Sequence, residues 1–326
     1  MRLPLFVVAL LLAVSLRAQP ASKALPPVPA GVTAHRDLAY VAVGHERQKL
    51  DLYLPAEGSG PFPVIVWIHG GAWFAGDRKN CPPLREGFVA RGYAVASLGY
   101  RLSSHEIFPA QIEDCKAALR WLRAHAKEYR LDAAHIGVWG ASAGGHLVSL
   151  LGTTDGVREF EVGAHLDQSS RVQAVVDYYG PTDFRQMDKH APASARQKHD
   201  DPESPESRLI GSPIQDAGSA APVRRANPIT YLEKTDPPFL IVHGDADATV
   251  PHHQSVLLYE AAVAHKVAVH FITIRGGGHG TAFPYRELHP VVASFFAEQL
   301  KGEKPATPAP ASRRSEMSAT PMATKK

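Results

Sequence analysis

Short apolar segments recur along the chain at wide spacing, and this pattern limits the fold more than any other feature of the sequence. Each segment is almost continuously apolar, as in residues 63–68 (PVIVWI) and 93–98 (YAVASL). The others are residues 136–139, 172–178, 239–242 and 267–274. Strands without a polar face must be buried on both sides, which is typical of parallel strands covered by helices. The sequence therefore predicts the α/β class, with a mostly parallel central sheet.

Segments with helical periodicity lie between most of these apolar runs. The clearest is 110–129, where apolar side chains recur every three or four residues and form one stripe. Similar stripes occur in residues 145–151, 252–264 and 287–300. Residues 38–43 and 49–54 are predicted to form a β-hairpin that precedes the parallel strands.

The segment 183–228 interrupts this alternation of strands and helices. It is polar, rich in Pro, Ser and Asp, and too long for an ordinary connection between two elements. We predict that it forms a cap or lid inserted over the carboxyl edge of the sheet.

Residues 1–18 have the pattern of a secretory signal, with Arg2 before an apolar run over residues 3–16. We predict cleavage after Ala18, with Ala21 as the alternative position. The competing interpretation, an uncleaved anchor helix, is disfavoured because the run falls well short of the roughly 20 residues that span a bilayer. The protein is thus expected to be secreted or periplasmic, with no membrane span after cleavage.

The two ends of the chain also explain its charge. The formal net charge is +3, but residues 301–326 carry six Lys or Arg against two Glu, and the leader adds two Arg. Residues 19–300 are therefore left with a formal charge of −3, and they contain no nucleic-acid motif, so we expect no nucleic-acid partner. Residues 19–36 are predicted to be a linker, and residues 301–326 a disordered tail poor in large apolar side chains.

A serine lies between the apolar run 136–139 and a predicted helix, in the pentapeptide Gly140 to Gly144 (GASAG). Small flanking residues permit a tight strand-to-helix turn that holds the serine hydroxyl clear of the sheet. The pentapeptide alone is a weak signal, and the strand before it and the helix after it strengthen it. Ser142 is therefore the predicted nucleophile.

A serine hydroxyl needs a base to accept its proton, and the base needs an acid to orient it. The apolar run 267–274 ends in a glycine-rich loop that holds His279, the predicted base. The run 239–242 ends in a turn that holds Asp245 and Asp247. We favour Asp247 as the acid, with Asp245 as the alternative.

The apolar run 63–68 ends in the loop HGGAW, whose small residues leave backbone N–H groups free to point at a developing negative charge. We expect the N–H groups of Gly71 and Ala72 to act as these oxyanion donors. The third expected donor is the N–H of Ala143, directly after the predicted nucleophile.

Two aromatic residues and two cysteines near these motifs have open roles. Trp73 and Phe74 follow the oxyanion loop, where they either line a substrate pocket or pack in the core. Cys81 and Cys115 would be free to oxidise in an exported protein, but two cysteines do not by themselves establish a disulfide.

Several motifs follow one another in a set order along the chain, and together they indicate a protein family more specifically than any one of them does alone. They are residues 69–79 (HGGAWFAGDRK), 99–102 (GYRL), 140–146 (GASAGGH), 243–251 (HGDADATVP) and 277–280 (GGHG). On these residues the chain resembles the α/β-hydrolase esterases, in the branch that includes hormone-sensitive-lipase-like enzymes and the acetylxylan and feruloyl esterases. The resemblance implies the α/β-hydrolase fold over residues 37–300, and its D-x-x-V-P segment assigns the acid to Asp247. Ala72 stands where lipase-like members often have a third glycine, which fits the second branch better.

The resemblance implies a serine carboxylic ester hydrolase that forms an acyl-enzyme and needs no cofactor and no metal. The implied substrate is a small-molecule or polysaccharide-linked ester with a short-chain, acetyl or feruloyl group. An amide or peptide hydrolase, similar to oligopeptidases or formamidases, is the alternative within enzymes. A non-catalytic binding protein with a hydrolase fold is disfavoured, because every expected triad and oxyanion residue is present. The oligomeric state stays open.

Overall fold

The computed structural model describes residues 27–195, 197–304 and 312–319, and in these ranges nine strands form one sheet. The strands are β1 (Val32–Ala39), β2 (Lys49–Pro55), β3 (Phe62–Ile68), β4 (Ala94–Leu98), β5 (Leu131–Ala141), β6 (Ala174–Tyr178), β7 (Phe239–Gly244), β8 (Val269–Arg275) and β9 (Ser312–Ser318). Their order across the sheet is β1-β2-β4-β3-β5-β6-β7-β8-β9. β2 pairs antiparallel with β1 and with β4, and all other neighbours pair parallel.

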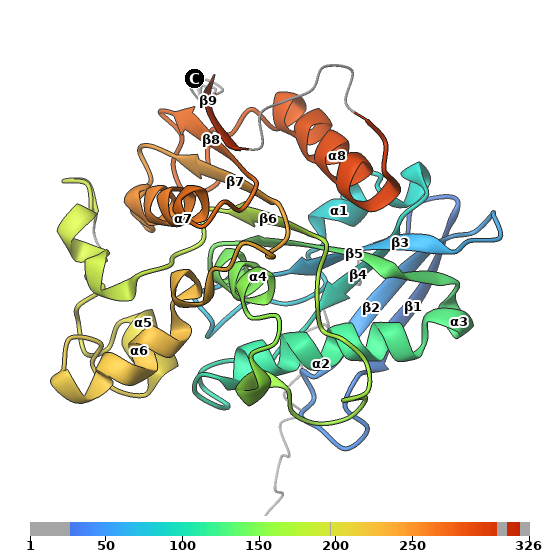
Figure 1. The fold of residues 1–326 in the computed structure, drawn as a ribbon, viewed down its shortest axis with the longest axis horizontal. Coiled ribbons are helices and arrows are strands. Elements are labelled where there is room, and N and C mark those ends of the chain that lie inside the picture. The colour runs from blue at the N-terminus through green and yellow to red at the C-terminus, as the bar shows by residue number, and fades with distance from the viewer. Residues whose placement is uncertain (1–26, 196, 305–311, 320–326) are drawn as a thin grey trace, which may run out of the picture.

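Helices cover both faces of this sheet. They are α1 (Pro82–Arg85), α2 (Ala110–Ala124), α3 (Ala126–Tyr129), α4 (Ala143–Thr153), α5 (Pro205–Ile210), α6 (Ala220–Ala226), α7 (His253–Ala264) and α8 (Tyr285–Lys301). Figure 1 shows α1 and α8 on one face, with α2 and α4 on the opposite face. The predicted mostly parallel sheet with flanking helices is therefore confirmed. The single helix expected over residues 110–129 is instead divided into α2 and α3 at His125.

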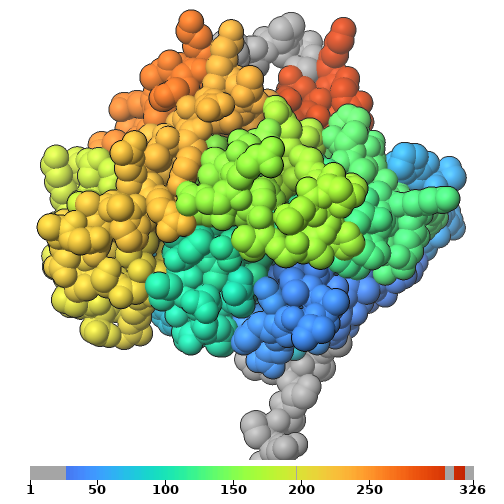
Figure 2. Space-filling view, turned by 60° about the horizontal axis from the view of Figure 1, so that its bottom comes forward, coloured from blue at the N-terminus to red at the C-terminus, as the bar shows by residue number. Residues whose placement is uncertain are grey.

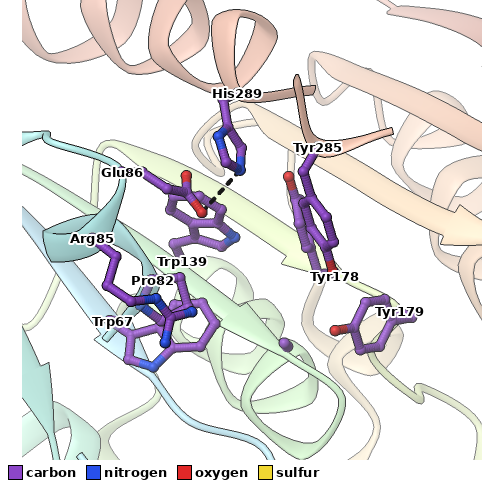
Figure 3. Close-up of a pocket in the computed structure, with 10 residues that line it drawn as sticks. Trp67, Pro82, Arg85, Glu86, Trp139, Tyr178, Tyr179, Tyr285 and His289 are labelled. Carbon is purple, nitrogen blue, oxygen red and sulfur yellow. Dashed lines mark ion pairs between the residues drawn. The ribbon is translucent and has the colours of Figure 1, made fainter. Parts of the chain in front are cut away.

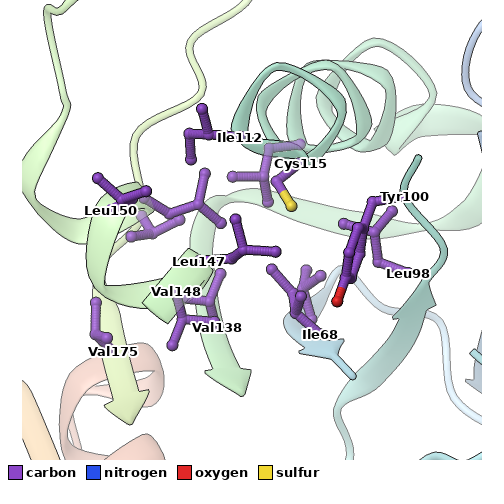
Figure 4. Packing of buried hydrophobic residues seen from close by; sticks show 14 of the residues in the cluster. Ile68, Leu98, Tyr100, Ile112, Cys115, Val138, Leu147, Val148, Leu150 and Val175 are labelled. Carbon is purple, nitrogen blue, oxygen red and sulfur yellow. The ribbon is translucent and has the colours of Figure 1, made fainter. Parts of the chain in front are cut away.

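An apolar core lies on each face of the sheet. Under α2 and α4, the side chains of Ile112, Cys115, Leu147 and Val138 are fully buried and pack together (Figure 4). The core under α1 and α8 is more aromatic and contains Trp67, Trp139 and Phe296. The apolar stripes seen in the sequence thus face the sheet from both sides, as buried parallel strands require.

The two cysteines lie in different cores. Cys81 belongs to the core under α1 and α8, whereas Cys115 belongs to the core under α2 and α4. Both thiols are buried and free. Burial raises the pKa of the Cys81 thiol to about 12, so this thiol stays protonated and unreactive at neutral pH.

The sheet extends further at both edges than the sequence predicted. β1 begins at Val32, inside the segment expected to be linker. β9 lies inside the tail expected to be disordered, which corrects that prediction for residues 312–318. The physical reason is that β9 pairs along its whole length with the edge strand β8, and such main-chain pairing needs no apolar sequence. Side chains add to it, because Ser315 Oγ lies 2.9 Å from His270 Nε2.

The predicted cap lies between β6 and β7 and consists of short helices and turns, including α5 and α6. It lies to one side of the sheet, below α7 in Figure 1. The Phe108 N–H donates a hydrogen bond of 2.8 Å to the Leu209 carbonyl, which joins the cap to the loop before α2. In Figure 2 the cap, coloured yellow to gold, lies next to the loop before α2, coloured teal.

The predicted signal, residues 1–18, lies outside the described residues. Of the helices that the structure describes, none has the length and apolar character needed to cross a membrane. The loops after β3, β7 and β8 and the turn after β5 are the segments that build the site described next.

Candidate active site

Ser142 occupies the turn that joins β5 to α4. Its backbone angles, φ 57° and ψ −124°, are rarely adopted by residues with a side chain and are typical of strained functional turns. A Cβ atom at Gly140 would overlap the Gly144 carbonyl group, and a Cβ atom at Gly144 would overlap the Ile68 carbonyl oxygen. Both glycines are therefore needed for the close backbone packing that holds this turn.

The structure brings Ser142, His279 and Asp247 together from three separate loops. Ser142 Oγ lies 2.9 Å from His279 Nε2, and His279 Nδ1 lies 2.8 Å from Asp247 Oδ2. A carboxylate only accepts hydrogen bonds, so Nδ1 carries the ring proton and Nε2 is free to accept the serine proton. The arrangement has the geometry by which a serine hydroxyl is activated as a nucleophile.

Asp247 is held by donors on both of its oxygens. Its Oδ1 accepts hydrogen bonds from the backbone N–H groups of Thr249, at 2.8 Å, and Val250, at 2.9 Å. Burial alone would raise the pKa of this carboxyl, but hydrogen bonds donated by the His243 and His279 rings hold it well below its usual range. Asp247 is therefore ionised at neutral pH and able to stabilise a protonated His279.

Asp245, the alternative acid, has a different place. Its Oδ1 accepts a hydrogen bond of 2.6 Å from the Gly276 N–H, in the loop that leads to His279. Asp245 thus holds the start of the histidine loop, while Asp247 contacts the histidine itself.

His243, at the end of β7, is a residue of this site that sequence reasoning missed. It is completely buried, and its Nε2 lies 2.9 Å from the Val250 carbonyl oxygen and 3.2 Å from Asp247 Oδ2. Both partners only accept, so Nε2 carries the proton, while Nδ1 accepts a hydrogen bond from Ser255 Oγ at 2.7 Å. Two sequence signals pointed to it: it is the first residue of the motif 243–251, and it lies four residues before Asp247 at the end of an apolar strand.

The loop that holds two of the expected oxyanion donors passes close to the same turn, because a Cβ atom at Gly70 would lie 3.1 Å from the Ser142 Cβ atom. Among the described residues, the N–H groups of Gly71 and Ala72 have no hydrogen-bond acceptor. Ala143 is the first residue of α4, so its N–H also lacks an acceptor within the helix. Gly71 has φ 112° and Ala72 has φ 51°, so the loop is held in an unusual conformation over both residues. Such free N–H groups are suited to stabilise a negatively charged oxygen.

The side chain of His69 anchors this loop. Its ring stacks on Tyr100, with 4.4 Å between the ring centroids, and its Nε2 lies 3.2 Å from Arg47 Nη2. Burial lowers the pKa of His69 to about 4, so the ring is neutral near pH 7. Arg47 also donates to the Gly76 carbonyl at 2.8 Å, which fixes the far end of the loop.

Trp73 and Phe74 have separate environments. Trp73 is 1% exposed and packs against His146 and Phe184, with its Nε1 donating to His146 Nδ1 at 3.2 Å. Trp73 therefore packs in the core, which is one of the two environments that the sequence left open for it. Phe74 is 45% exposed, so its ring is accessible to a ligand. His146 Nε2 in turn donates to the Ala226 carbonyl at 2.6 Å, which connects the oxyanion loop to the cap.

We find no group of three or more His, Cys, Asp or Glu side chains placed to hold a metal ion within the part of the chain that the structure describes. The contacts described above bring together a serine hydroxyl, a histidine base and backbone N–H donors.

Comparisons with known proteins agree with this geometry. Residues 50–262 match the BD-FAE family, and the chain belongs to that family. It is 35% identical to a solved structure described as a truncated carbohydrate esterase from gut microbiota, with a TM-score of 0.73, covering 82% of this chain and 96% of that one. It is also similar to esterase B from Lactobacillus rhamnosis, at 26% identity and a TM-score of 0.65, covering 85% and 88%. The resemblance to α/β-hydrolase esterases is thus confirmed.

Among curated proteins, the chain is 31% identical to esterase LipC of Mycobacterium tuberculosis, over 80% of this chain. The match spans 64% of the length of LipC, and 44% of the length of the probable carboxylic ester hydrolase LipM from the same organism. The chain therefore matches less than two thirds of the length of LipC and less than half of the length of LipM.

Replacing His243 tests whether this buried ring positions Asp247. In His243→Leu, Asp247 loses one hydrogen bond and a neighbouring polar ring, so His279 is less firmly oriented. We expect kcat/KM for p-nitrophenyl acetate to fall about tenfold to hundredfold, the range set by one hydrogen bond to a charged group. The loss should lie mainly in kcat, and His243→Gln, which retains a donor, should recover part of it.

The matched control is His265→Leu, at an exposed position after α7. It should behave like the wild type. Wild-type kcat in a folded His243→Leu protein would show that His243 does not position the acid.

Proposed function

We propose that this chain is a serine carboxylic ester hydrolase that acts through Ser142, His279 and Asp247. The observation that carries the proposal is the continuous chain of contacts from Ser142 Oγ through the His279 ring to Asp247, at 2.9 and 2.8 Å. The names of the relatives, which are esterases and carboxylic ester hydrolases, support the same reaction class.

The reaction follows from the positions of these atoms. Ser142 Oγ bonds to the ester carbonyl carbon while its proton passes to His279 Nε2. The N–H groups of Gly71, Ala72 and Ala143 stabilise the oxyanion, with about 2.7 to 4 kcal/mol for one such donor. When the bond to the alcohol oxygen breaks, His279 returns the proton to that oxygen and leaves an acyl-enzyme. Water then attacks the acyl carbonyl carbon while one of its protons passes to His279 Nε2. His279 returns this proton to Ser142 Oγ as the bond between Oγ and the acyl carbon breaks, which releases the acid.

We further propose that the substrate is an ester of a carbohydrate or a related small molecule, carrying an acetyl, another short-chain or a feruloyl group. The description of one similar structure as a carbohydrate esterase supports this class. Phe74, two residues after Ala72 in the chain, is 45% exposed and offers an apolar surface to a substrate.

Ser142→Ala tests the proposal, because it removes the nucleophile and only one oxygen atom. We expect hydrolysis of p-nitrophenyl acetate, methyl ferulate and acetylated xylan to fall at least a thousandfold, with the thermal unfolding temperature near that of the wild type. Steady-state kinetics on each ester, with a p-nitroanilide as the amide counterpart, measure the effect. Retained turnover by the folded variant would refute the assignment, and a wild type that prefers the amide would favour an amidase.

The leader in residues 1–18 supports the further proposal that the enzyme is secreted or periplasmic. Expression of the full chain in a bacterial host, followed by N-terminal sequencing of the exported protein, tests it. We expect a mature chain that begins at Gln19. Full-length protein retained in the cytoplasm would contradict export.

A further inference from the structure

A buried histidine joins the cap to the loop that carries the proposed catalytic acid. His199, in the cap, is 1% exposed. Its Nε2 lies 3.0 Å from the carbonyl oxygen of Thr249, and the Thr249 N–H donates to Asp247 Oδ1 at 2.8 Å. Thr249 belongs to the acid loop, residues 245–252, which joins β7 to α7. One residue of this loop therefore contacts both the cap and the triad acid.

The other ring nitrogen of His199 faces a carboxylate. Its Nδ1 lies 3.1 Å from Oε1 of Glu206, in the cap helix α5, and the two side chains are only 2% and 3% exposed. Figure 1 shows α5 below α7, the helix that follows the acid loop. Within the described ranges this is the only ion pair of Glu206, and its second oxygen has no hydrogen-bond partner. His199 is therefore the side chain of those ranges that is placed to balance the charge of Glu206.

The partners of the ring determine where its protons lie. A carbonyl oxygen and an ionised carboxylate accept hydrogen bonds and donate none, so each ring nitrogen needs a proton of its own. A histidine with both nitrogens protonated carries a positive charge. Asp188, in the short helix η4 (Asp188–His190), favours this charge, and its carboxylate accepts hydrogen bonds of 3.0 Å from the backbone N–H groups of His199 and Asp200.

The surroundings of His199 shift its pKa in the direction that this charge requires. Burial is the largest single effect and lowers the pKa, but Glu206 on α5, Asp188 on η4 and the Thr249 carbonyl on the acid loop together outweigh it. The pKa of His199 is therefore raised above its ordinary value of 6.5. His146, which is equally buried, contacts Trp73 and a backbone carbonyl instead of a carboxylate, and its pKa is lowered to about 4.

Loss of one proton from the His199 ring would leave one of its two partners without a donor. A buried carboxylate without a counter-charge or a donor is strongly unfavourable, so the remaining proton stays with Glu206. The bare Nε2 then faces the Thr249 carbonyl oxygen, and two acceptors repel each other. Thr249 consequently holds Asp247 less firmly, and Asp247 orients His279 less firmly.

We propose that His199, as a buried imidazolium, is a positioning residue that fixes the acid loop to the cap, and that loss of its proton lowers the activity of the triad. The proposal rests on the proposed ester hydrolase function, because it concerns how the acid of that reaction is held. Activity then falls as the pH rises through the pKa of His199. The stability that the contact contributes follows the same sense, because it is present below the pKa of an unfolded histidine and is lost as the pH rises through the higher pKa of folded His199.

A double variant without the titrating group tests this role. In His199→Gln/Glu206→Gln, the glutamine at 199 keeps a donor for the Thr249 carbonyl, while both buried charges are removed. We measure kcat and KM for p-nitrophenyl acetate from about pH 5 to pH 9 and divide the wild-type kcat by that of the variant, so that titration of His279 cancels. We expect the ratio to be constant at low pH and to fall about fivefold to tenfold as His199 loses its proton, as one hydrogen bond predicts. The ratio of the KM values should not change.

The matched control is His135→Gln/Asp132→Asn, which removes a histidine–carboxylate pair at the opposite end of β5 from Ser142. Its histidine is 46% exposed. The ratio of wild-type kcat to that of the control should stay constant over the whole pH range. If the double variant does not fold, Glu206→Gln alone keeps the test decisive, because without its counter-charge His199 should lose its proton, and kcat should fall, at a lower pH than in the wild type.

NMR of protein labelled with ¹⁵N-histidine measures the charge of His199 independently of activity. Comparison with the spectrum of His199→Gln identifies its signals. We expect both ring nitrogens to be protonated in more than half of the molecules at pH 6.5, since the pKa is raised above that value. A neutral ring at that pH, with the shared proton on Glu206, would overturn the proposal.

The kinetic outcomes separate this proposal from the proposed function. A kcat ratio that does not change with pH in an active wild type, or that changes equally in the control, would overturn the role of His199 alone. A wild type that hydrolyses no ester would overturn the proposed function and, with it, the part of His199 in catalysis.

Discussion

The close backbone packing beneath Ser142 is the constraint on which the rest of the site depends. Gly144, in the first turn of α4, lies so close to the Ile68 carbonyl that no side chain fits between them. Ile68 ends β3, and the oxyanion loop begins at the next residue. One contact therefore sets the position of the nucleophile turn relative to the loop that supplies two of the N–H donors. The unusual backbone conformation of Ser142, with a φ of 57°, is supported by the close packing of the glycines on both sides of it.

The acid and the base depend on a second constraint, the parallel pairing of β7 with β8. Parallel strands end at the same edge of a sheet, so the loops after them, which carry Asp247 and His279, are neighbours. The cap is connected to these loops as well. His199 Nε2 lies 3.0 Å from the carbonyl oxygen of Thr249, whose N–H holds Asp247, and His146 connects the oxyanion loop to the cap through Ala226. A change in the cap would therefore reach both the acid loop and the oxyanion loop.

The sequence was most informative where the chemistry needs a specific residue at a specific strand end. Ser142, Asp247 and His279 follow apolar runs directly, and a parallel sheet gathers such positions at one edge, so the site was predictable in outline. Position alone did not show whether an aromatic side chain would turn inward, and Trp73 and Phe74 are adjacent residues with opposite environments. β9 was not predictable, because its stability comes from main-chain pairing with β8 and not from its polar sequence.

Residues that position other residues of the site were the hardest to predict from the sequence. The role of His243 depends on three partner atoms, from Asp247, Val250 and Ser255, and its spacing from Asp247 resembles many unrelated pairs. A pocket of about 370 Å³ with aromatic walls is even less visible in sequence, because its walls come from β3, β5, β6, α1 and α8 (Figure 3). Only the three-dimensional arrangement shows that Glu86 Oε1 and His289 Nε2 lie 3.0 Å apart.

The central claim is that His279 makes Ser142 a nucleophile in the folded protein. Peptide mass spectrometry after reaction with a fluorophosphonate tests it most directly, because the reagent labels only an activated serine. The account predicts one adduct per chain, located on Ser142, and labelling of His279→Ala that is at least a hundredfold slower. Labelling at another residue, or equally fast labelling without His279, would contradict it.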